Sequence, residues 1–194
     1  RVEVAALNYD PRITNSEGGS FDHYTARVLY GNSHGLCGQY RTSGFSISVV
    51  PVAAQNGSMQ RDYWYSHRRK FSQLEDTEKV GQIAAMRTLR RLGAKKVKTQ
   101  VAPVVFEPLM SARLLAHLAA ALSGYALYKG TSFLAGKLGT QVASPQVTLV
   151  DDGTLLGGLG SRPFDGEGLA TRKTTVIDGG ILRSYLLDTY SARK

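Results

Sequence analysis

The sequence predicts an α+β fold, in which at least two helices pack on an antiparallel or mixed β-sheet. Three observations lead to this prediction. Short strand-like segments separated by glycine-rich turns fill residues 26–65. Two segments with helical spacing of apolar residues follow, one between Asp76 and Gly93 and one between Pro108 and Gly124. Further strand-like runs occupy the last part of the chain.

We expect the chain to begin in the last part of a helix. Apolar residues recur there at helical spacing, at Val2, Ala5, Ala6 and Tyr9. Asp10 and Pro11 end this pattern, because proline cannot continue a helix beyond its first turn. We therefore expect residues 1–20 to hold the tail of a preceding helix and a junction to the main domain.

An antiparallel meander is expected next. Its strand-like runs cover residues 26–30, 37–42, 45–52 and 59–65. Phe45, Ile47 and Val49 alternate with serines, so the third run should turn one face to the core and the other to solvent.

A helix follows the meander. Asp76 is placed to cap its N-terminus, and Gly93 is placed to end it. One face of this helix is apolar and the opposite face is basic. The apolar face carries Gly81, Ala85, Leu89 and Leu92, and the basic face carries Lys79, Arg87, Arg90 and Arg91.

The rest of the chain combines strands with a second helix. A short strand is expected at residues 101–106, and Pro108 then opens a helix that Gly124 closes. The absence of a recognisable linker or repeat predicts one α+β domain over residues 21–194. Later strands are expected at residues 147–150, 174–177 and 181–187, with a tight hairpin turn at residues 178–180. The apolar stripe of the second helix consists of Ala112, Leu115, Ala119 and Leu122.

The composition is that of a basic globular protein. Lys and Arg outnumber Asp and Glu by 24 to 15 in 194 residues, which gives a net charge of +9. Such a surface attracts nucleic acid, anionic lipid or an acidic protein, and charge alone does not choose among them. No apolar run reaches the roughly 18 residues that span a bilayer, so no membrane partner is expected. The single Cys37 excludes an intrachain disulfide and fits a reducing compartment, so we expect a cytoplasmic protein.

Few residues are spaced for catalysis or metal binding. His34 and Cys37 could form a thiolate and imidazole pair or two metal ligands, but no further ligand lies near them in the sequence. A glycine-rich turn with a buried thiol is favoured instead. His117 points away from the apolar stripe of its helix, so we expect a solvated or interface histidine and not a metal ligand. Asp165 and Glu167 could bind a cation or hold a proton, although Asp-Gly sequences mostly form turns.

Four stretches of the sequence resemble the TldD/PmbA family, whose members have also been called modulators of DNA gyrase. The resemblance covers the whole chain and implies that residues 21–194 belong to an incomplete carboxy-terminal α+β domain of a longer protein. The stretches occur in the family's order, at residues 10–18 (DPRITNSEG), 129–139 (KGTSFLAGKLG), 160–168 (GSRPFDGEG) and 185–194 (YLLDTYSARK).

The second helix distinguishes the two branches of that family. TldD-like members carry His-Glu-x-x-x-His there, which supplies two imidazoles for a metal and a carboxylate that activates its water. The resemblance aligns the two histidines with Leu115 and Ala120, and the glutamate with Ala116. His117 is offset by two residues from the first ligand position. The chain therefore resembles the PmbA branch, which is also called TldE.

The resemblance implies a metal-free subunit without catalytic residues or metal ligands of its own. It also implies pairing with a TldD-like protease subunit that binds a divalent metal such as zinc, or self-association, and a role in cleaving unfolded peptides. The alternative is a basic regulatory module that acts on DNA or DNA gyrase. Residues expected to shape turns or interfaces are Lys129, Ser132, Asp165, Glu167 and Gly168.

Overall fold

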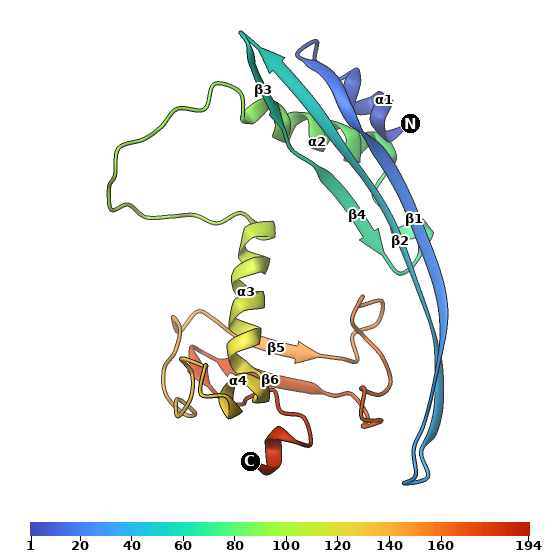
Figure 1. Ribbon diagram of the computed structural model, residues 1–194, viewed down its shortest axis with the longest axis vertical. Coiled ribbons are helices and arrows are strands. Elements are labelled where there is room, and N and C mark those ends of the chain that lie inside the picture. The colour runs from blue at the N-terminus through green and yellow to red at the C-terminus, as the bar shows by residue number, and fades with distance from the viewer. The chain divides into compact units, whose positions relative to one another are not determined.

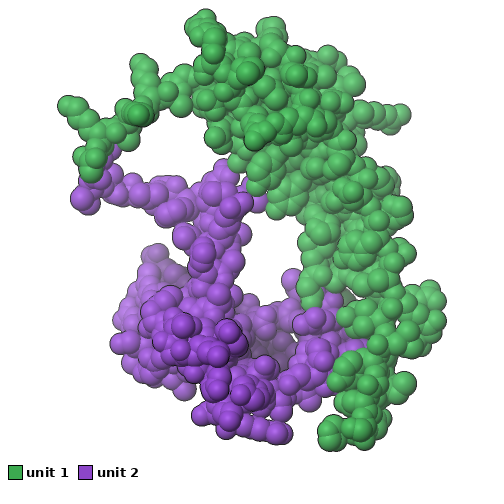
Figure 2. Space-filling view, viewed as in Figure 1, with its two compact units in different colours: residues 1–99, 156–160 green, residues 100–155, 161–194 purple.

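The computed structural model describes residues 1–194, which form two compact units (Figure 2). Unit 1 comprises Arg1–Thr99 and Leu156–Gly160, and unit 2 comprises Gln100–Leu155 and Ser161–Lys194. Each unit combines helices with an antiparallel sheet, so the predicted α+β class is confirmed.

The sheet of unit 1 is built around one long central strand. This strand is β2 (Cys37–Gln55), and β1 (Ile13–Gly31) pairs with it in antiparallel fashion along one edge. Two short strands, β3 (Ser58–Arg61) and β4 (Trp64–Arg68), pair with different parts of β2. Residues 52–55 of β2 contact β3 and residues 45–49 contact β4, so the sheet has four strands.

The predicted meander is wrong in its boundaries and in its order. The runs 37–42 and 45–52 are one strand, because Ser43 and Gly44 continue the ladder opposite Thr25 and Tyr24. The run 59–65 is two strands, since the backbone N–H of Asp62 donates to Oγ1 of Thr88 (3.1 Å) between them.

Two helices cover one face of this sheet (Figure 1). They are α1 (Val2–Leu7) and α2 (Thr77–Arg90), and both were predicted. The side chain of Asp76 caps α2 by accepting from the N–H of Glu78 (2.8 Å), as expected. A methyl group on Gly81 would lie 2.4 Å from the carbonyl oxygen of Val2, so the helices can cross this closely only because Gly81 has no side chain. The core between them and the sheet consists of Val2, Ala6, Ile13, Ile47, Val49, Ala53, Val80, Ala84 and Ala85.

The two long strands of unit 1 continue beyond β4 as a two-stranded ribbon (Figure 1). We call this ribbon the arm and define it as residues 24–31 of β1 and 37–44 of β2. Asn32 closes its end, where Oδ1 accepts from the N–H groups of His34 (3.1 Å) and Leu36 (3.2 Å). At the base of the arm lies the short 3-10 helix η1 (Phe71–Gln73), whose Phe71 ring contacts Phe45.

Residues 94–107 contain no helix or strand. The predicted strand at 101–106 is therefore wrong, because the segment has no neighbouring strand and the side chains of Val101 and Val105 are exposed. The segment separates two hydrophobic clusters, whereas the sequence predicted one domain over residues 21–194.

Unit 2 contains two helices, a small sheet and a final 3-10 turn. The helices are α3 (Pro108–Leu122) and α4 (Gly124–Tyr128), and the turn is η2 (Ser191–Arg193). The antiparallel sheet has the order β5 (Leu149–Asp152), β6 (Lys173–Asp178) and β7 (Ile181–Leu182). Its core consists of Ala121, Leu122, Leu134, Val176, Ile177 and Leu182.

The hairpin turn between β6 and β7 is confirmed, with Gly179 and Gly180 at φ values of +53° and +81°. The predicted strand at 181–187 is too long. β7 ends at Leu182, and Leu186 instead forms an isolated parallel bridge with Ser123.

The predicted apolar stripe of α3 is only partly buried. Leu122 is fully buried, but Ala112, Leu115 and Ala119 are exposed. The reason is that the core of unit 2 contacts only the C-terminal end of this helix. No helix in the chain combines the length and the hydropathy that a bilayer crossing requires.

Candidate functional site

Helix α3 presents aliphatic side chains to solvent over its middle turns. Pro108 occupies its first turn, where a missing N–H costs nothing, and the hydroxyl of Ser111 donates to the carbonyl of Phe106 (3.3 Å). Leu115 is 47% exposed, and Ala116, His117 and Ala120 are exposed as well. The exposure of His117 agrees with the expected solvated or interface position.

The donor chemistry of this helix does not suit a metal. A zinc site needs three or four nitrogen, sulfur or oxygen ligands, and the side chains of Leu115, Ala116 and Ala120 have none of these atoms. Elsewhere in the chain no three His, Cys, Asp or Glu side chains are grouped so that they could hold a metal ion.

The loop after α4 is tied to the end of α3. Ser132 is almost fully buried, and its hydroxyl donates to the carbonyl of Ala121 (2.6 Å) while accepting from the N–H of Leu134 (3.1 Å). The ammonium group of Lys129 lies 5.8 Å and 5.6 Å from the ring centres of Tyr125 and Tyr128, which is cation–π geometry. Lys129 thus rests on the aromatic side of α4.

Tyr185 fixes the same loop from the other side. Its hydroxyl donates to the carbonyl of Leu134 (2.7 Å) and accepts from the N–H of Lys137 (3.2 Å). The N–H of Leu186 donates to the carbonyl of Leu122 (2.9 Å), so the same segment also contacts the end of α3. Residues 129–139 and 185–194 therefore form one hydrogen-bonded assembly in unit 2.

Asp165 closes a tight turn. Its Oδ1 accepts from the N–H groups of Glu167 and Leu169, both at 2.9 Å, and its own N–H donates to the carbonyl of Leu169 (2.8 Å). Gly168 has a φ of +81° in this turn, a conformation that glycine adopts without steric cost.

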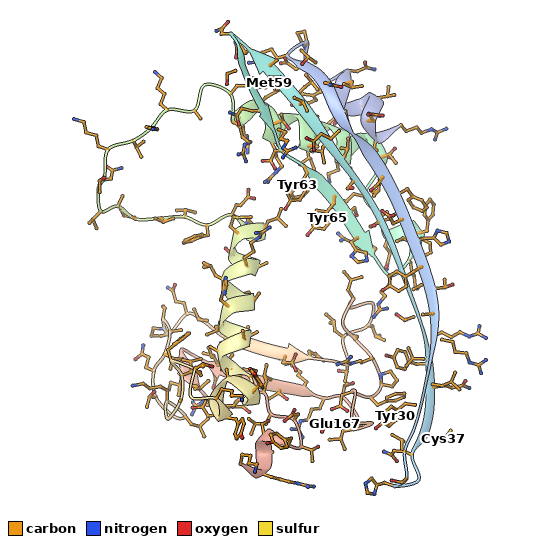
Figure 3. All side chains as sticks on the ribbon, in the orientation of Figure 1. Tyr30, Cys37, Met59, Tyr63, Tyr65 and Glu167 are labelled. Carbon is orange, nitrogen blue, oxygen red and sulfur yellow. The ribbon has the colours of Figure 1, made fainter.

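Glu167, which is labelled in Figure 3, connects this turn to the segment that precedes η2. Its Oε2 accepts from both the N–H (2.9 Å) and the hydroxyl (2.8 Å) of Thr189. Next to Thr189, Oδ1 of Asp188 accepts from the N–H of Ser191 (2.7 Å) and from its hydroxyl. The hydrogen bond from the Ser191 hydroxyl lowers the pKa of Asp188 below its ordinary value. Sequence reasoning missed Thr189 and Tyr185 as partners, although both lie in the last of the four matching stretches.

The first matching stretch is held by an ion pair in unit 1. Asp10 accepts from the backbone N–H and Nε of Arg12 on Oδ1 (both 2.9 Å) and from Nη2 on Oδ2 (2.8 Å). The side-chain hydrogen bonds from Arg12 lower the pKa of Asp10 to about 2.

Cys37 is exposed, so the predicted buried thiol is wrong. It lies in the arm, where two strands alone provide no core around it. The backbone of His34 forms part of the turn at the arm's end.

Two domain models match consecutive parts of the chain. Residues 1–92 match the PmbA/TldA metallopeptidase central domain, and residues 99–194 match the PmbA/TldA metallopeptidase C-terminal domain. The chain belongs to the PmbA/TldD family. Residues 93–98, which separate the two matched ranges, lie between the two hydrophobic clusters.

Relatives within the PmbA/TldD family match over the entire chain. Metalloprotease PmbA of Escherichia coli O157:H7 is 44% identical over 194 residues, which cover 100% of this chain and 43% of the relative. A crystal structure from Bacteroides thetaiotaomicron, described as a modulator of DNA gyrase, has a TM-score of 0.92 at 34% identity and covers 99% of this chain and 44% of that one. TldE from Thermococcus kodakarensis has a TM-score of 0.87 at 26% identity, over 99% and 43% of the two chains. The chain thus spans about two fifths of the length of these PmbA/TldD family members.

Proposed function

We propose that this PmbA/TldD family chain is part of a metal-free subunit that pairs with a TldD-like metallopeptidase subunit in the cytoplasm. In this role it assists the cleavage of unfolded peptides, and the partner supplies the metal, which is zinc or a similar divalent ion. The similarity to metalloprotease PmbA and to TldE supports the protease context.

The observation that carries the proposal is the chemistry of α3. The positions that correspond to the metal-binding motif of TldD-like members carry Leu115, Ala116 and Ala120, none of which can bind a metal or activate water. A subunit of a metallopeptidase with these side chains depends on another chain for the reaction. Lys129, Ser132, Asp165, Glu167 and Gly168 serve this role by holding the loops of unit 2 in a fixed shape.

Co-expression of the chain with a TldD-like subunit tests the proposal. Native mass measurement should detect a complex of the two chains, and that complex should cleave an unfolded peptide in a chelator-sensitive way. The isolated chain should be inactive. Chelator-sensitive cleavage by the isolated chain, or no complex with any TldD-like subunit, would contradict the proposal.

A second candidate is a basic module that acts on DNA or DNA gyrase, which the net charge of +9 favours. Each phosphate neutralised by the protein contributes about −0.9 to the slope of log K against log salt. We expect weak, sequence-independent duplex binding that disappears by physiological salt. Tight binding to a defined site at that salt concentration would favour the DNA-binding function.

A further inference from the structure

We propose that the arm of unit 1 binds an acidic surface of the TldD-like subunit. This inference rests on the proposed function, because it names the part of this chain that meets the partner. It follows from the exposure of the arm, the composition of one of its faces, and its charge.

The arm has no third strand beyond β4, although Arg69 ties its base to unit 1 through hydrogen bonds with Thr42 and Ser43. Eight cross-strand pairs, from Tyr24 opposite Gly44 to Gly31 opposite Cys37, lie beyond the last pair that β2 makes with β4, Phe45 opposite Arg68. Two strands alone are at best marginally stable in water, and a third strand or a packed layer is normally needed. Figure 3 labels Tyr30 and Cys37 on this part of the chain. A partner that packs on the ribbon would supply the missing layer.

One face of the arm combines aromatic, aliphatic and arginine side chains. Cross-strand register places Arg27, Leu29 and Arg41 on the same face as Phe21 and Phe45 nearer the core. The ring of Phe71 packs edge-on against both phenylalanines at 6.0 Å. Leu29 is 68% exposed, Phe71 64% and Phe21 51%. We call this surface the arm face and define it by Phe21, Arg27, Leu29, Arg41 and Phe71. Aromatic residues and arginine are enriched in protein–protein interfaces.

The arm face carries positive charge without a carboxylate. Arg27 and Arg41 lie directly opposite each other in the ladder, an arrangement of like charges that destabilises a strand pair. Arg27 donates through Nε to Oε1 of Gln39 (2.8 Å), a neutral acceptor. The sequence contains no Asp or Glu from His23 to Arg61. A surface that brings carboxylates to these two guanidinium groups would replace the repulsion with charge-assisted hydrogen bonds.

The charge of the arm face favours an acidic protein over the other possible occupants. A second copy of this chain carries a net charge of +9 and would add to the positive field. A DNA duplex presents phosphates but little apolar surface for Leu29 and Phe71. An acidic protein surface that also carries apolar residues matches both the positive charge and the exposed apolar side chains of the arm face. In the proposed function, that protein is the TldD-like subunit.

The test compares two charge-matched variants of the chain in its complex with the TldD-like subunit. The first is the double substitution Arg27→Gln and Arg41→Gln. The control is Lys96→Gln and Lys98→Gln, which removes the same charge from the exposed segment 94–107. We expect the arm variant to bind the partner at least about tenfold more weakly, because arginines in an interface commonly contribute this much to affinity. The control should bind with the affinity of the unchanged chain.

Salt dependence and thermal unfolding complete the experiment. High salt should weaken the unchanged complex more than the arm-variant complex, because the contacts that the two substitutions remove are ionic and are screened by salt. The arm variant should melt no lower than the unchanged chain, since the substitutions remove a repulsion. A second variant, Leu29→Ser, should also weaken binding while leaving the charge intact.

Four results would overturn the inference. Equal partner affinity of the arm variant and the control would refute it while leaving the proposed function in place. Loss of self-association in the arm variant alone would assign the arm face to a second copy, and loss of duplex binding alone would assign it to DNA. If the unchanged chain binds no TldD-like subunit, the proposed function and the inference both fail.

Discussion

Glu167 holds Thr189 through two hydrogen bonds to one carboxylate oxygen, although the residues are 22 positions apart in the sequence. The bonds connect the turn formed by Asp165 to the segment that contains Tyr185. Tyr185 in turn fixes the loop that follows α4. Three of the four stretches that identify the family therefore form one structural assembly in unit 2.

Replacing Glu167 should loosen that assembly. Glu167→Ala removes the acceptor of both bonds and should lower the free energy of unfolding by about 1 kcal/mol, the usual net value for a hydrogen bond. Glu167→Gln keeps a side-chain oxygen and should lose less. Denaturant unfolding measures both values. Equal stability of all three proteins would show that the Glu167–Thr189 bonds contribute nothing.

We expect Asp165 to stabilise its turn and to take no direct part in peptide cleavage. Asp165→Asn keeps one oxygen for the N–H groups of Glu167 and Leu169 but removes its charge, so it should lower the melting temperature or the affinity for the partner subunit. Asp165→Ala should lower them further. A chain with unchanged melting temperature and affinity whose complex has lost peptidase turnover would indicate a role in the reaction instead.

Ser132 should contribute more to stability than its neighbour Thr131. Ser132→Ala leaves the buried carbonyl of Ala121 and N–H of Leu134 without the hydroxyl, and should cost about 1–3 kcal/mol. Thr131→Ala is the matched control. Its hydroxyl makes an exposed 3.3 Å bond to the carbonyl of Ala126, which also accepts from the backbone N–H of Thr131. Unfolding free energies that rank the two substitutions in the opposite order would contradict this expectation.

The ion pair of Asp10 and Arg12 should make stability depend on acidic pH. Hydrogen bonds from Arg12 lower the pKa of Asp10 from 3.8 to about 2, so the unfolded chain binds this proton more readily than the folded chain does. The stabilisation is fully present above 3.8 and is lost as the pH falls through about 2.

Asp10→Asn removes this contribution at every pH. The difference in melting temperature between the unchanged chain and the variant should be largest near neutral pH and should shrink between about pH 4 and about pH 2. Thermal unfolding across this range measures it. A difference that stays constant down to the lowest pH would show that Asp10 does not titrate as expected.

The isolated chain should contain no stoichiometric metal. Elemental analysis of protein purified without chelator should find far less than one zinc per chain, because Leu115, Ala116 and Ala120 offer no ligand atoms. The complex with a TldD-like subunit should contain the metal of the partner. About one zinc per isolated chain would contradict the assignment.

Local signals in the sequence predicted local structure well. Asp76 caps α2, and Gly179 with Gly180 forms the hairpin turn, because both depend on residues within a few positions of one another. The apolar run at Val101–Phe106 shows the limit of such signals. An apolar run becomes a strand only where a sheet edge accepts it, and the presence of that edge depends on distant residues.

The candidate site was harder to predict for the same reason. The turn-forming tendency of Asp165 is visible in the adjacent glycine, and the Asp165 side chain does accept from two backbone N–H groups in a turn. The contact between Glu167 and Thr189 has no sequence signal, since nothing in either neighbourhood specifies a partner 22 residues away. The exposure of Leu115 was also missed, because helical spacing identifies an apolar stripe but not what covers it.

The packing of α1 against α2 at Gly81 determines when the core of unit 1 can form during protein synthesis. The ribosome completes α1 first, but the helix that covers it ends about eighty residues later, at Arg90. Until then Val2 and Ala6 lack the contacts that α2 provides, and α1 is the only helix on the core face of the long β1–β2 hairpin. A nascent chain that ends before Thr77 therefore exposes part of the apolar face of this sheet, to which a chaperone can bind. This face becomes buried only after α2 has been synthesised.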